Sequence, residues 1–235
     1  MLNIEGLNSH YGRSHIIQGI DLTAAPGEVI GIFGRNGVGK TTLLKTIAGW
    51  VKPSSGTIRL GDASLAGLEP DRITRLGVGL VPEDRRIFPG LTVEENLTLG
   101  FMQARGRTAS AERALLGEIY DRFPRLRERR HQLGTTLSGG EQQMLAMARV
   151  LVGAPKLVLV DEPSEGLAPM IVAEVFAIVR ELKERGAMVL LVEQNVHEAL
   201  SVTDRFVVIE RGRVVLSGEA EDAGDRERLM RALAV

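Results

Sequence analysis

The stretch Gly34-Arg35-Asn36-Gly37-Val38-Gly39-Lys40-Thr41-Thr42 decides the fold of this 235-residue chain. It fits the pattern G-x-x-x-x-G-K-[ST] and stands between a short apolar run, residues 29–33, and a segment with helical spacing, residues 41–48. Glycines in such a loop let successive backbone N–H groups converge on phosphate oxygens, and the positive end of the following helix faces the same oxygens. We therefore expect a phosphate-binding loop between a buried strand and a helix.

Two side chains of this loop have separate expected tasks. Lys40 would reach the β- and γ-phosphates of a nucleotide as a point charge, and the Thr41 hydroxyl would ligate Mg²⁺. The alternative is a glycine-rich turn that binds nothing. Such a turn has no need of a lysine and a threonine between these two elements, so we favour the phosphate site.

A second segment, Leu157–Glu162, is an apolar run that ends in two carboxylates. Next to the phosphate-binding loop, Asp161 would hold Mg²⁺ directly or through water. Glu162 is placed to polarise the attacking water as a general base. An apolar strand that ends in Asp-Glu is common by itself, but together with the loop it indicates nucleotide hydrolysis.

The rest of the chain predicts a parallel α/β core, because strands alternate with helices. Helical spacing after Pro169 predicts a helix with Ile171, Val175, Ile178, Val179 and Leu182 on one face. The β-rich start and a mostly helical middle, residues 93–152, are expected as insertions around that core. Apolar runs predict strands at residues 2–7, 15–22, 57–60, 78–81, 157–160 and 188–192, a hairpin over 206–216 and a surface helix within 219–235.

Composition excludes several classes of protein. The 29 Lys and Arg residues against 30 Asp and Glu give a net charge of −1, so we expect no nucleic-acid partner that is bound through a basic surface. The absence of cysteine excludes disulfides, thiolate metal sites and a cysteine nucleophile. The longest apolar runs, such as residues 187–192, fall far short of the ~20 residues of a membrane-spanning helix.

The segment Leu137–Gln143, Leu-Ser-Gly-Gly-Glu-Gln-Gln, resembles the LSGGQ signature of ABC ATPases. Ser138 and two glycines would open a helix, so that a hydroxyl, backbone N–H groups and the helix dipole face an anion. The alternative is an ordinary N-cap in which Glu141 completes a capping box with Ser138. Capping does not call for Gly139 and Gly140, which is why we favour the signature, although both roles are compatible.

The resemblance to ABC ATPases extends over essentially the whole chain. It implies one ABC ATPase domain over residues 1–235, with a RecA-like P-loop NTPase core, an antiparallel β subdomain and an α-helical signature subdomain at about 93–152. It also implies ATP and Mg²⁺ as cofactors, with ATP between two ATPase subunits. Tyr11 falls where the family stacks an aromatic ring on adenine, although an edge-strand tyrosine is the alternative. The nucleotide-binding residues that the resemblance implies are Tyr11, Gly34, Arg35, Asn36, Gly37, Val38, Gly39, Lys40, Thr41, Thr42, Ser138, Gly139 and Gly140.

Within the family, the chain resembles the second ATPase subunit of branched-chain amino-acid importers, on the segments Val81–Phe88, Glu162–Pro169 and Val192–Asn195. Each segment departs from the wider pattern. They carry Glu83 for the usual glutamine, Ala168 for the usual aspartate and Gln194 for the usual switch histidine.

These departures bear on mechanism. We expect Glu83 either to ligate Mg²⁺, with Arg85 or Arg86 compensating its charge, or to face solvent. Gln194 can donate a hydrogen bond to the γ-phosphate but cannot carry a proton, so Glu162 is the expected base and Gln194 a positioning group. Ala168 favours a non-identical ATPase partner.

The function that the resemblance implies is ATP hydrolysis that drives an ABC importer of branched-chain or other hydrophobic amino acids. The implied partners are transmembrane permease subunits, a second ATPase subunit in a homo- or heterodimer and, indirectly, a substrate-binding protein. The implied location is peripheral, at the cytoplasmic face of the inner or plasma membrane. Phe88–Gly90 is the expected docking stretch for the permease, and the arginines of Arg105–His131 are expected on a solvated helical face. Alternatives are a urea or amide importer, or a soluble ABC-type ATPase outside transport.

Overall fold

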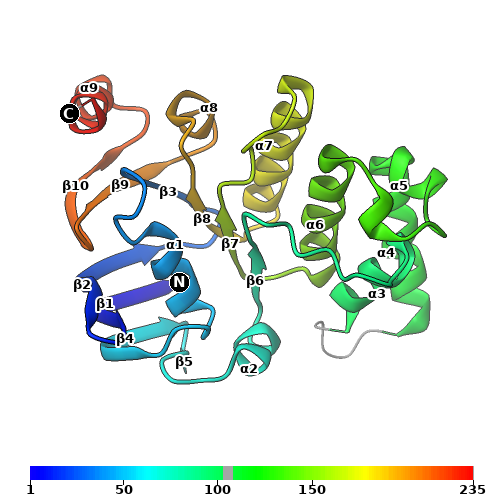
Figure 1. Cartoon of the computed structure of the whole chain (residues 1–235), viewed down its shortest axis with the longest axis horizontal. Helices are drawn as coiled ribbons and strands as arrows, with labels where there is room; N and C mark the ends of the chain where they lie inside the picture. The colour runs from blue at the N-terminus through cyan, green and yellow to red at the C-terminus, as the bar shows by residue number, and fades with distance from the viewer. Residues whose placement is uncertain (103–107, 235) are drawn as a thin grey trace.

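The computed structural model describes residues 1–102 and 108–234, whose strands form two sheets (Figure 1). The larger sheet has the strand order β10-β9-β3-β8-β7-β6. Strands β9, β3, β8, β7 and β6 run parallel, and β10 closes the edge antiparallel to β9. The strands are β3 (Val29–Phe33), β6 (Val78–Val81), β7 (Leu157–Asp161), β8 (Met188–Val192), β9 (Arg205–Glu210) and β10 (Arg213–Glu219).

The second sheet is antiparallel, with the order β2-β1-β4-β5, and is built from the N-terminal part of the chain. Its strands are β1 (Leu2–Tyr11), β2 (Ser14–Ala24), β4 (Pro53–Leu60) and β5 (Ala63–Ser64). The helix that follows the phosphate-binding loop, α1 (Lys40–Ile47), lies between the two sheets (Figure 1).

The elements described between Val93 and Gly153 are all helices, and they gather at the end of the molecule away from the antiparallel sheet (Figure 1). They are α3 (Val93–Phe101), α4 (Ala109–Arg122), α5 (Pro124–Glu128), the 3₁₀ turn η1 (Gly134–Thr136) and α6 (Gly139–Gly153). The remaining helices are α2 (Pro70–Arg75), α7 (Pro169–Glu184), α8 (Val196–Leu200) and α9 (Ala223–Leu233).

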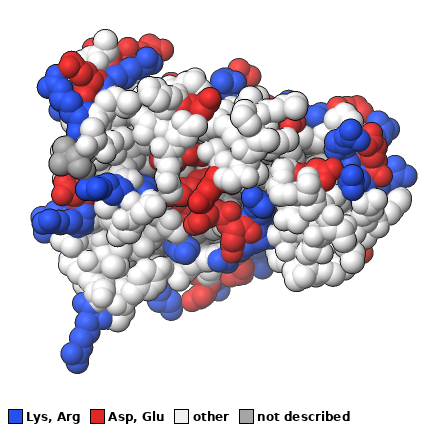
Figure 2. All heavy atoms as spheres, turned by 45° about the horizontal axis from the view of Figure 1, so that its top comes forward, with Lys and Arg blue, Asp and Glu red and all other residues white. Residues whose placement is uncertain are grey.

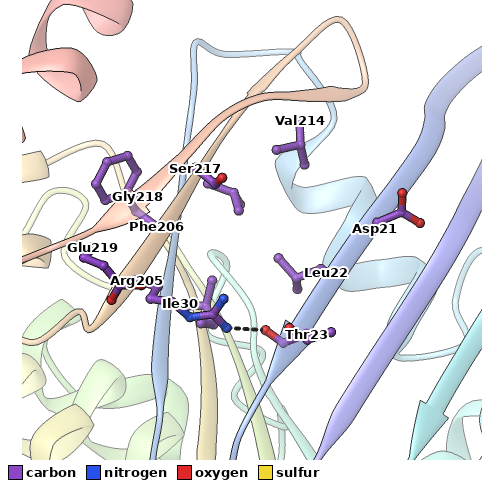
Figure 3. A pocket seen from close by; sticks show the side chains of 11 residues that line it. Asp21, Leu22, Thr23, Ile30, Arg205, Phe206, Val214, Ser217, Gly218 and Glu219 are labelled. Carbon is purple, nitrogen blue, oxygen red and sulfur yellow. Dashed lines mark hydrogen bonds between the residues drawn. The ribbon is translucent and has the colours of Figure 1, made fainter. Parts of the chain in front are cut away.

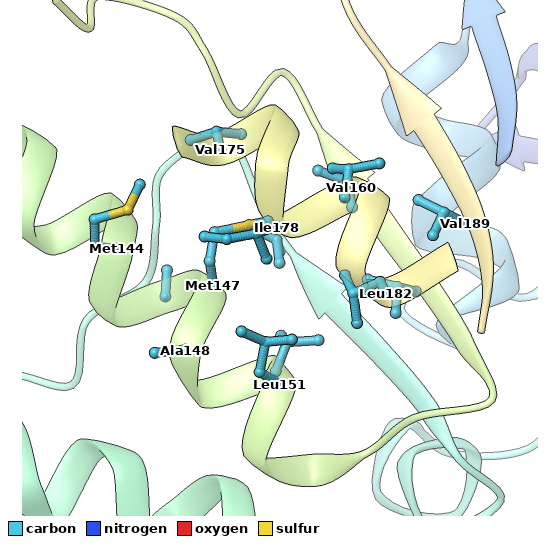
Figure 4. Close-up of a cluster of buried hydrophobic side chains, with 14 of the residues drawn as sticks. Met144, Met147, Ala148, Leu151, Val160, Val175, Ile178, Leu182 and Val189 are labelled. Atoms are coloured by element: carbon cyan, nitrogen blue, oxygen red, sulfur yellow. The ribbon is translucent and has the colours of Figure 1, made fainter. Parts of the chain in front are cut away.

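A hydrophobic core lies on each face of the larger sheet, because its central strands are buried on both sides. One core joins alternate residues of β3, such as Ile30 and Ile32, to α1 and the antiparallel sheet. The other joins the opposite face to helices α3 to α7. Figure 4 shows how α6 and α7 interlock there on β7 and β8, with the side chains of Met144, Met147, Ala148, Leu151, Val160, Val175, Ile178, Leu182 and Val189.

The predicted elements are confirmed, whereas β5, α2 and α8 were not predicted. Strand β1 runs beyond the predicted 2–7 to Tyr11, and β2 extends slightly beyond 15–22 at both ends, because their long hairpin continues beyond the apolar core positions. Helix α7 starts at Pro169 as predicted, with Phe176 buried in addition to the predicted face. The terminal helix is α9, whose Leu229 is buried.

The arginine-rich stretch forms a charged, largely exposed surface. Arg105 and Arg107 lie outside the described residues. Ion pairs of the stretch join Arg122 to Glu181, Arg125 to Glu128, Arg127 to Asp121 and Arg129 to Glu141. This agrees with the expected solvated face. Among the helices of the described residues, none combines the length and apolar composition that a membrane crossing requires.

The packing of α3 on α6 yields a stability prediction at Gly100. A Cβ atom there would overlap the carbonyl oxygen of Arg149 and a methyl group of Val152. Gly100→Ala should therefore lower the free energy of unfolding by about 1–3 kcal/mol, as measured by urea denaturation. The control is Gly117→Ala in α4, where the added methyl meets open space and the change should be neutral or stabilising by up to about 1 kcal/mol. Equal destabilisation by both changes would contradict the close approach.

Candidate active site

The site lies at the carboxyl ends of β3, β7 and β8. The parallel register pairs Ile32 with Val192 and Asp161 with Val192, so the three strands end at nearly the same level. The segments that follow them are therefore neighbours: the loop that starts at Gly34, the carboxylate of Glu162, and the turn that carries Gln194. Ligands of open parallel sheets bind at this edge.

The loop folds around the ammonium group of Lys40, which is only 4% exposed. Its Nζ donates to the carbonyl oxygens of Gly34 at 2.8 Å and Arg35 at 3.1 Å, and lies 3.8 Å from Glu162 Oε1. Helix α1 begins at Lys40 directly after Gly39, so its free N–H groups point into the loop. The arrangement presents several donors and one cation to a small volume, as polyphosphate binding requires.

Thr41 and Asp161 form the hard-oxygen pair that the sequence predicted. The Thr41 hydroxyl donates to Asp161 Oδ1 at 3.1 Å. Burial raises the pKa of Asp161 to about 6, against the lowering effect of this hydrogen bond and with added repulsion from Glu162 and Glu83. A buried carboxylate beside a hydroxyl is a donor set that Mg²⁺ prefers, and a bound cation would remove the cost of keeping the carboxylate charged. The residues present therefore fit Mg²⁺.

A cavity of about 330 Å³ joins the phosphate-binding loop to the candidate catalytic residues. Figure 2 shows acidic side chains gathered in the middle of the face that is turned forward, with lysine and arginine at the borders of the group. The structure thus brings together most of the predicted site. The lining residues are Ile16, Asn36, Gly37, Gly39, Lys40, Thr41, Thr42, Glu83, Glu162, Glu165 and Gln194.

The predicted base and its positioning group are in direct contact. Gln194 Nε2 donates to Glu162 Oε2 at 2.6 Å. Glu162 has a φ of 44°, a conformation that a non-glycine residue adopts at a cost, and its N–H donates to the carbonyl oxygen of Val192 at 2.9 Å. The backbone therefore turns the carboxylate of Glu162 toward the loop, and Gln194 holds it there.

Glu83 lies at this cavity but is exposed. Its carboxylate is within 4.8 Å of those of Glu162 and Glu165, and the pKa of Glu83 is raised by partial burial and by these two neighbours. Lys45 is the cation that lowers it. The expectation that Arg85 or Arg86 compensates Glu83 is wrong, because Arg86 pairs with Asp84 at 3.0 Å and neither arginine is among the groups that lower the pKa of Glu83.

The signature residues and Tyr11 are not among the residues that line the cavity. Ser138 forms the full capping box with Glu141: its hydroxyl and its backbone N–H both donate to the Glu141 carboxylate, at 2.8 and 2.9 Å. Gly140 has a packing reason as well, since a Cβ there would crowd Ile171 of α7 at 3.1 Å. Tyr11 ends β1 and is 49% exposed.

The sequence pattern assigned no role to Glu193, although this residue lies in the segment Val192–Asn195. This side chain is 3% exposed and accepts three backbone N–H bonds, from Ser164 at 3.0 Å, Gln194 at 2.9 Å and Asn195 at 3.2 Å. It therefore joins the segment after Glu162 to the segment after β8. The signal was a glutamate directly after a buried strand, where an unpartnered carboxylate is unfavourable.

Comparison with known proteins identifies the family. The sequence pattern described as ABC transporter matches residues 17–165, which contain the phosphate-binding loop, the signature and the Asp161-Glu162 pair. The chain belongs to the ABC transporter family. It is 42% identical over 216 residues to the high-affinity branched-chain amino acid transport ATP-binding protein BraG of Pseudomonas aeruginosa, covering 92% of this chain and 91% of BraG.

Two further comparisons agree. The chain is 35% identical to a probable branched-chain amino acid transport ATP-binding protein, LivF, of Archaeoglobus fulgidus, over 97% of this chain and 96% of that protein. A solved structure of the ATP binding subunit of an ABC transporter superposes with a TM-score of 0.86 at 27% identity, over 100% of this chain and 95% of the other. The chain is an ABC ATP-binding subunit with the P-loop NTPase fold, and an ATPase.

The buried Glu193 yields a prediction about catalytic geometry. Glu193→Ala would leave three backbone N–H groups without their acceptor and loosen the two segments that hold Glu162 and Gln194 in register. We expect kcat for ATP hydrolysis to fall about tenfold or more, because small misplacements of reacting groups are costly. Steady-state phosphate release measures it. The control is Glu198→Ala, an exposed carboxylate nearby, and equal kcat values for the two variants would contradict the positioning role.

Proposed function

We propose that the chain powers an ABC importer for branched-chain or other hydrophobic amino acids. The observation that carries the catalytic part is the contact of Glu162 with Gln194 at 2.6 Å, beside Lys40 at 3.8 Å. The observation that favours this substrate class is the similarity to BraG and LivF over more than nine-tenths of the chain. A urea or amide importer is the alternative within transport, and a soluble ABC-type ATPase the alternative outside it.

ATP would be held by the nucleotide-binding residues of the loop, Gly34 to Thr42. Backbone N–H groups and Lys40 would bind the phosphates, and the ring of Tyr11 would stack on adenine. Thr41 and Asp161 would hold Mg²⁺, with Glu83 at the edge of the same cavity. When bound, Mg²⁺ neutralises phosphate charge and assists departure of the leaving group.

Hydrolysis would use Glu162 as the general base and Gln194 as a positioning group. Glu162 accepts a proton from water as the water oxygen attacks the γ-phosphorus, and the bond to the ADP oxygen breaks. Gln194 fixes the Glu162 carboxylate through its amide and can donate its second N–H to the γ-phosphate.

The proposed working unit is a dimer of ATPase subunits. This chain would supply one ABC ATPase domain, residues 1–235, with its helical subdomain at about 93–152. Ser138, Gly139 and Gly140 stand outside the cavity of their own chain, which suits a role toward ATP on the other subunit. Helix α6 would present its N-terminus and the Ser138 hydroxyl to the γ-phosphate. Ala168 in place of a carboxylate favours a heterodimer over a homodimer.

The proposed docking site for the permease is a groove of about 280 Å³ between α2, β6 and α6. Trp50 and Phe88 are 41% and 46% exposed at its border, and arginines cover their rings: Arg86 over Trp50 at 4.0 Å and Arg149 over Phe88 at 5.0 Å. Exposed aromatic and arginine side chains are typical anchors of protein interfaces. Docking here would keep the chain at the cytoplasmic face of the membrane and link it indirectly to the substrate-binding protein.

The catalytic assignment is tested by Glu162→Gln in the assembled transporter. The amide keeps the shape of Glu162 but cannot accept the proton, so turnover should fall about 100-fold or more. ATP affinity should stay within about twofold of the parent, because Lys40 and the loop are untouched. Phosphate release and binding of a fluorescent ATP analogue measure the two quantities.

A second variant separates the base from the positioning group. Gln194→Ala should reduce turnover less than Glu162→Gln does, because it removes a hydrogen bond and no proton acceptor. Turnover unchanged in Gln194→Ala would refute the positioning role of Gln194, and turnover retained in Glu162→Gln would refute the proposed base.

The docking assignment is tested by Phe88→Glu with co-expressed permease subunits. The new charge would be buried when the permease docks, so the amount of co-purified permease should fall about tenfold, with ATP binding unchanged. Val215→Glu is the control, since Val215 is also an exposed apolar residue, at 54%, but lies on β10. Equal co-purification by the two variants would argue against this groove.

The substrate class needs a separate measurement. Uptake of branched-chain amino acids, urea and amides by vesicles with the intact complex distinguishes the three substrates.

A further inference from the structure

The turn between β9 and β10, Glu210–Arg213, meets the nucleotide-binding loop at its back. The Gly212 N–H donates to the carbonyl oxygen of Val38 at 2.9 Å, and the Gly212 carbonyl oxygen accepts from the N–H of Gln18 in β2 at 2.8 Å. One residue of the turn is thus bonded on one side to the loop and on the other to the antiparallel sheet. We propose that Gly212 is a positioning residue for nucleotide binding, which holds the phosphate-binding loop against β2.

The close approach at this point admits only glycine. Gly212 has a φ of 78° and follows Arg211 at 47°, the backbone of a tight hairpin turn with two left-handed residues. A Cβ at Gly212 would overlap the carbonyl oxygen of Ile16 and lie 2.9 Å from its carbon. Any side chain there must push the turn away from β2, and the Val38 hydrogen bond moves with it.

The phosphate-binding loop also packs against β9 and β2 at two of its own glycines. Gly34 is packed so closely on β9 that a Cβ would overlap the carbonyl oxygen of Ile209. Gly39 faces Ile16 and Ile17 of β2, with a Cβ position 3.3 Å from the Ile16 carbonyl oxygen. Both ends of the loop and its middle, at Val38, therefore depend on where the β9–β10 hairpin meets β2.

Below the turn, β2 and β10 separate. Figure 3 shows Leu22 of β2 facing Val214 and Ser217 of β10 across a cavity of about 300 Å³, with Arg205 bonded to the Thr23 carbonyl oxygen at its far end. Side chains of β2 and β9 share a hydrophobic core here, with Val214 of β10 packed against it. Next to the loop, the two sheets are joined by the backbone of Gly212, together with a hydrogen bond from Arg213 Nε to Gln18 Oε1 at 3.2 Å.

The inference rests on the proposed role of residues 34–42 in binding phosphate. It also predicts which kinetic constant a change at Gly212 affects. The hydrogen bonds of Gly212 go to the loop and to β2, whereas Glu162 and Gln194 follow β7 and β8. A change at Gly212 should therefore weaken ATP binding and leave the chemical step intact at saturation. A loss of ground-state binding raises KM with kcat unchanged.

The test uses the full chain with Gly212→Ala, and with Gly212→Asn as a second variant, because asparagine tolerates left-handed backbone but carries the same Cβ. Matched controls are Gly61→Ala and Gly61→Asn: Gly61 also has a positive φ, of 57°, in a hairpin turn, but a Cβ there meets nothing within 4 Å. Titration calorimetry gives the Kd for ATP, steady-state kinetics give KM and kcat, and circular dichroism checks folding.

We expect both Gly212 variants to raise the Kd and KM for ATP about tenfold or more, with kcat within about twofold of the parent, and both Gly61 variants to leave all three unchanged. A Kd within twofold of the parent in a folded Gly212 variant overturns the inference. So does a fall in kcat with unchanged KM, or a failure of both Gly212 variants to fold while the Gly61 variants fold.

Lys40→Ala separates this inference from the proposed function. If Lys40→Ala loses ATP binding and the Gly212 variants bind normally, only the positioning role of Gly212 fails. If Lys40→Ala binds ATP as the parent does, the assignment of residues 34–42 fails first.

Discussion

The parallel register of β3, β8 and β7 is the constraint on which the site depends. Ile32 and Asp161 both pair with Val192, so three separate segments leave the sheet at one edge. Hydrophobic cores on both faces of these strands fix that register, because a slip by one residue would exchange the two faces. The segments that carry Lys40 and Glu162 therefore leave the sheet from strands whose residues are all buried.

The site carries an excess of negative charge. The cavity gathers several carboxylates around one buried ammonium group, that of Lys40. Burial raises the pKa of Asp161 to about 6, and crowding by Glu162 and Glu165 contributes to the raised pKa of Glu83. Such a cluster of carboxylates is unfavourable without a divalent cation. It suits a ligand that brings Mg²⁺ together with a polyphosphate. The net charge of the whole chain, −1, does not reveal this local cluster of carboxylates.

Hydrogen bonds to main-chain groups hold the segments around the site in place. Gly212 joins Val38 to Gln18, and buried Glu193 joins the segments after β7 and β8 through three N–H groups. Both devices act on the positions of main-chain segments, and the catalytic side chains project from those segments. The fold thus separates two proposed tasks: β2 and the β9–β10 turn would support the binding loop, and the segments after β7 and β8 would carry the reacting groups.

The sequence by itself determined most of the elements and indicated the chemistry of the site. Lys40, Thr41, Asp161 and Glu162 are candidate site residues because each stands at a fixed distance from a buried strand or a helix start, which is a local property. The tertiary structure decided what depends on contacts between distant segments. It brought the Ser164 N–H to the carboxylate of Glu193 and placed Ile16 against Gly212. No local pattern encodes these contacts, because they join segments that lie far apart in the sequence.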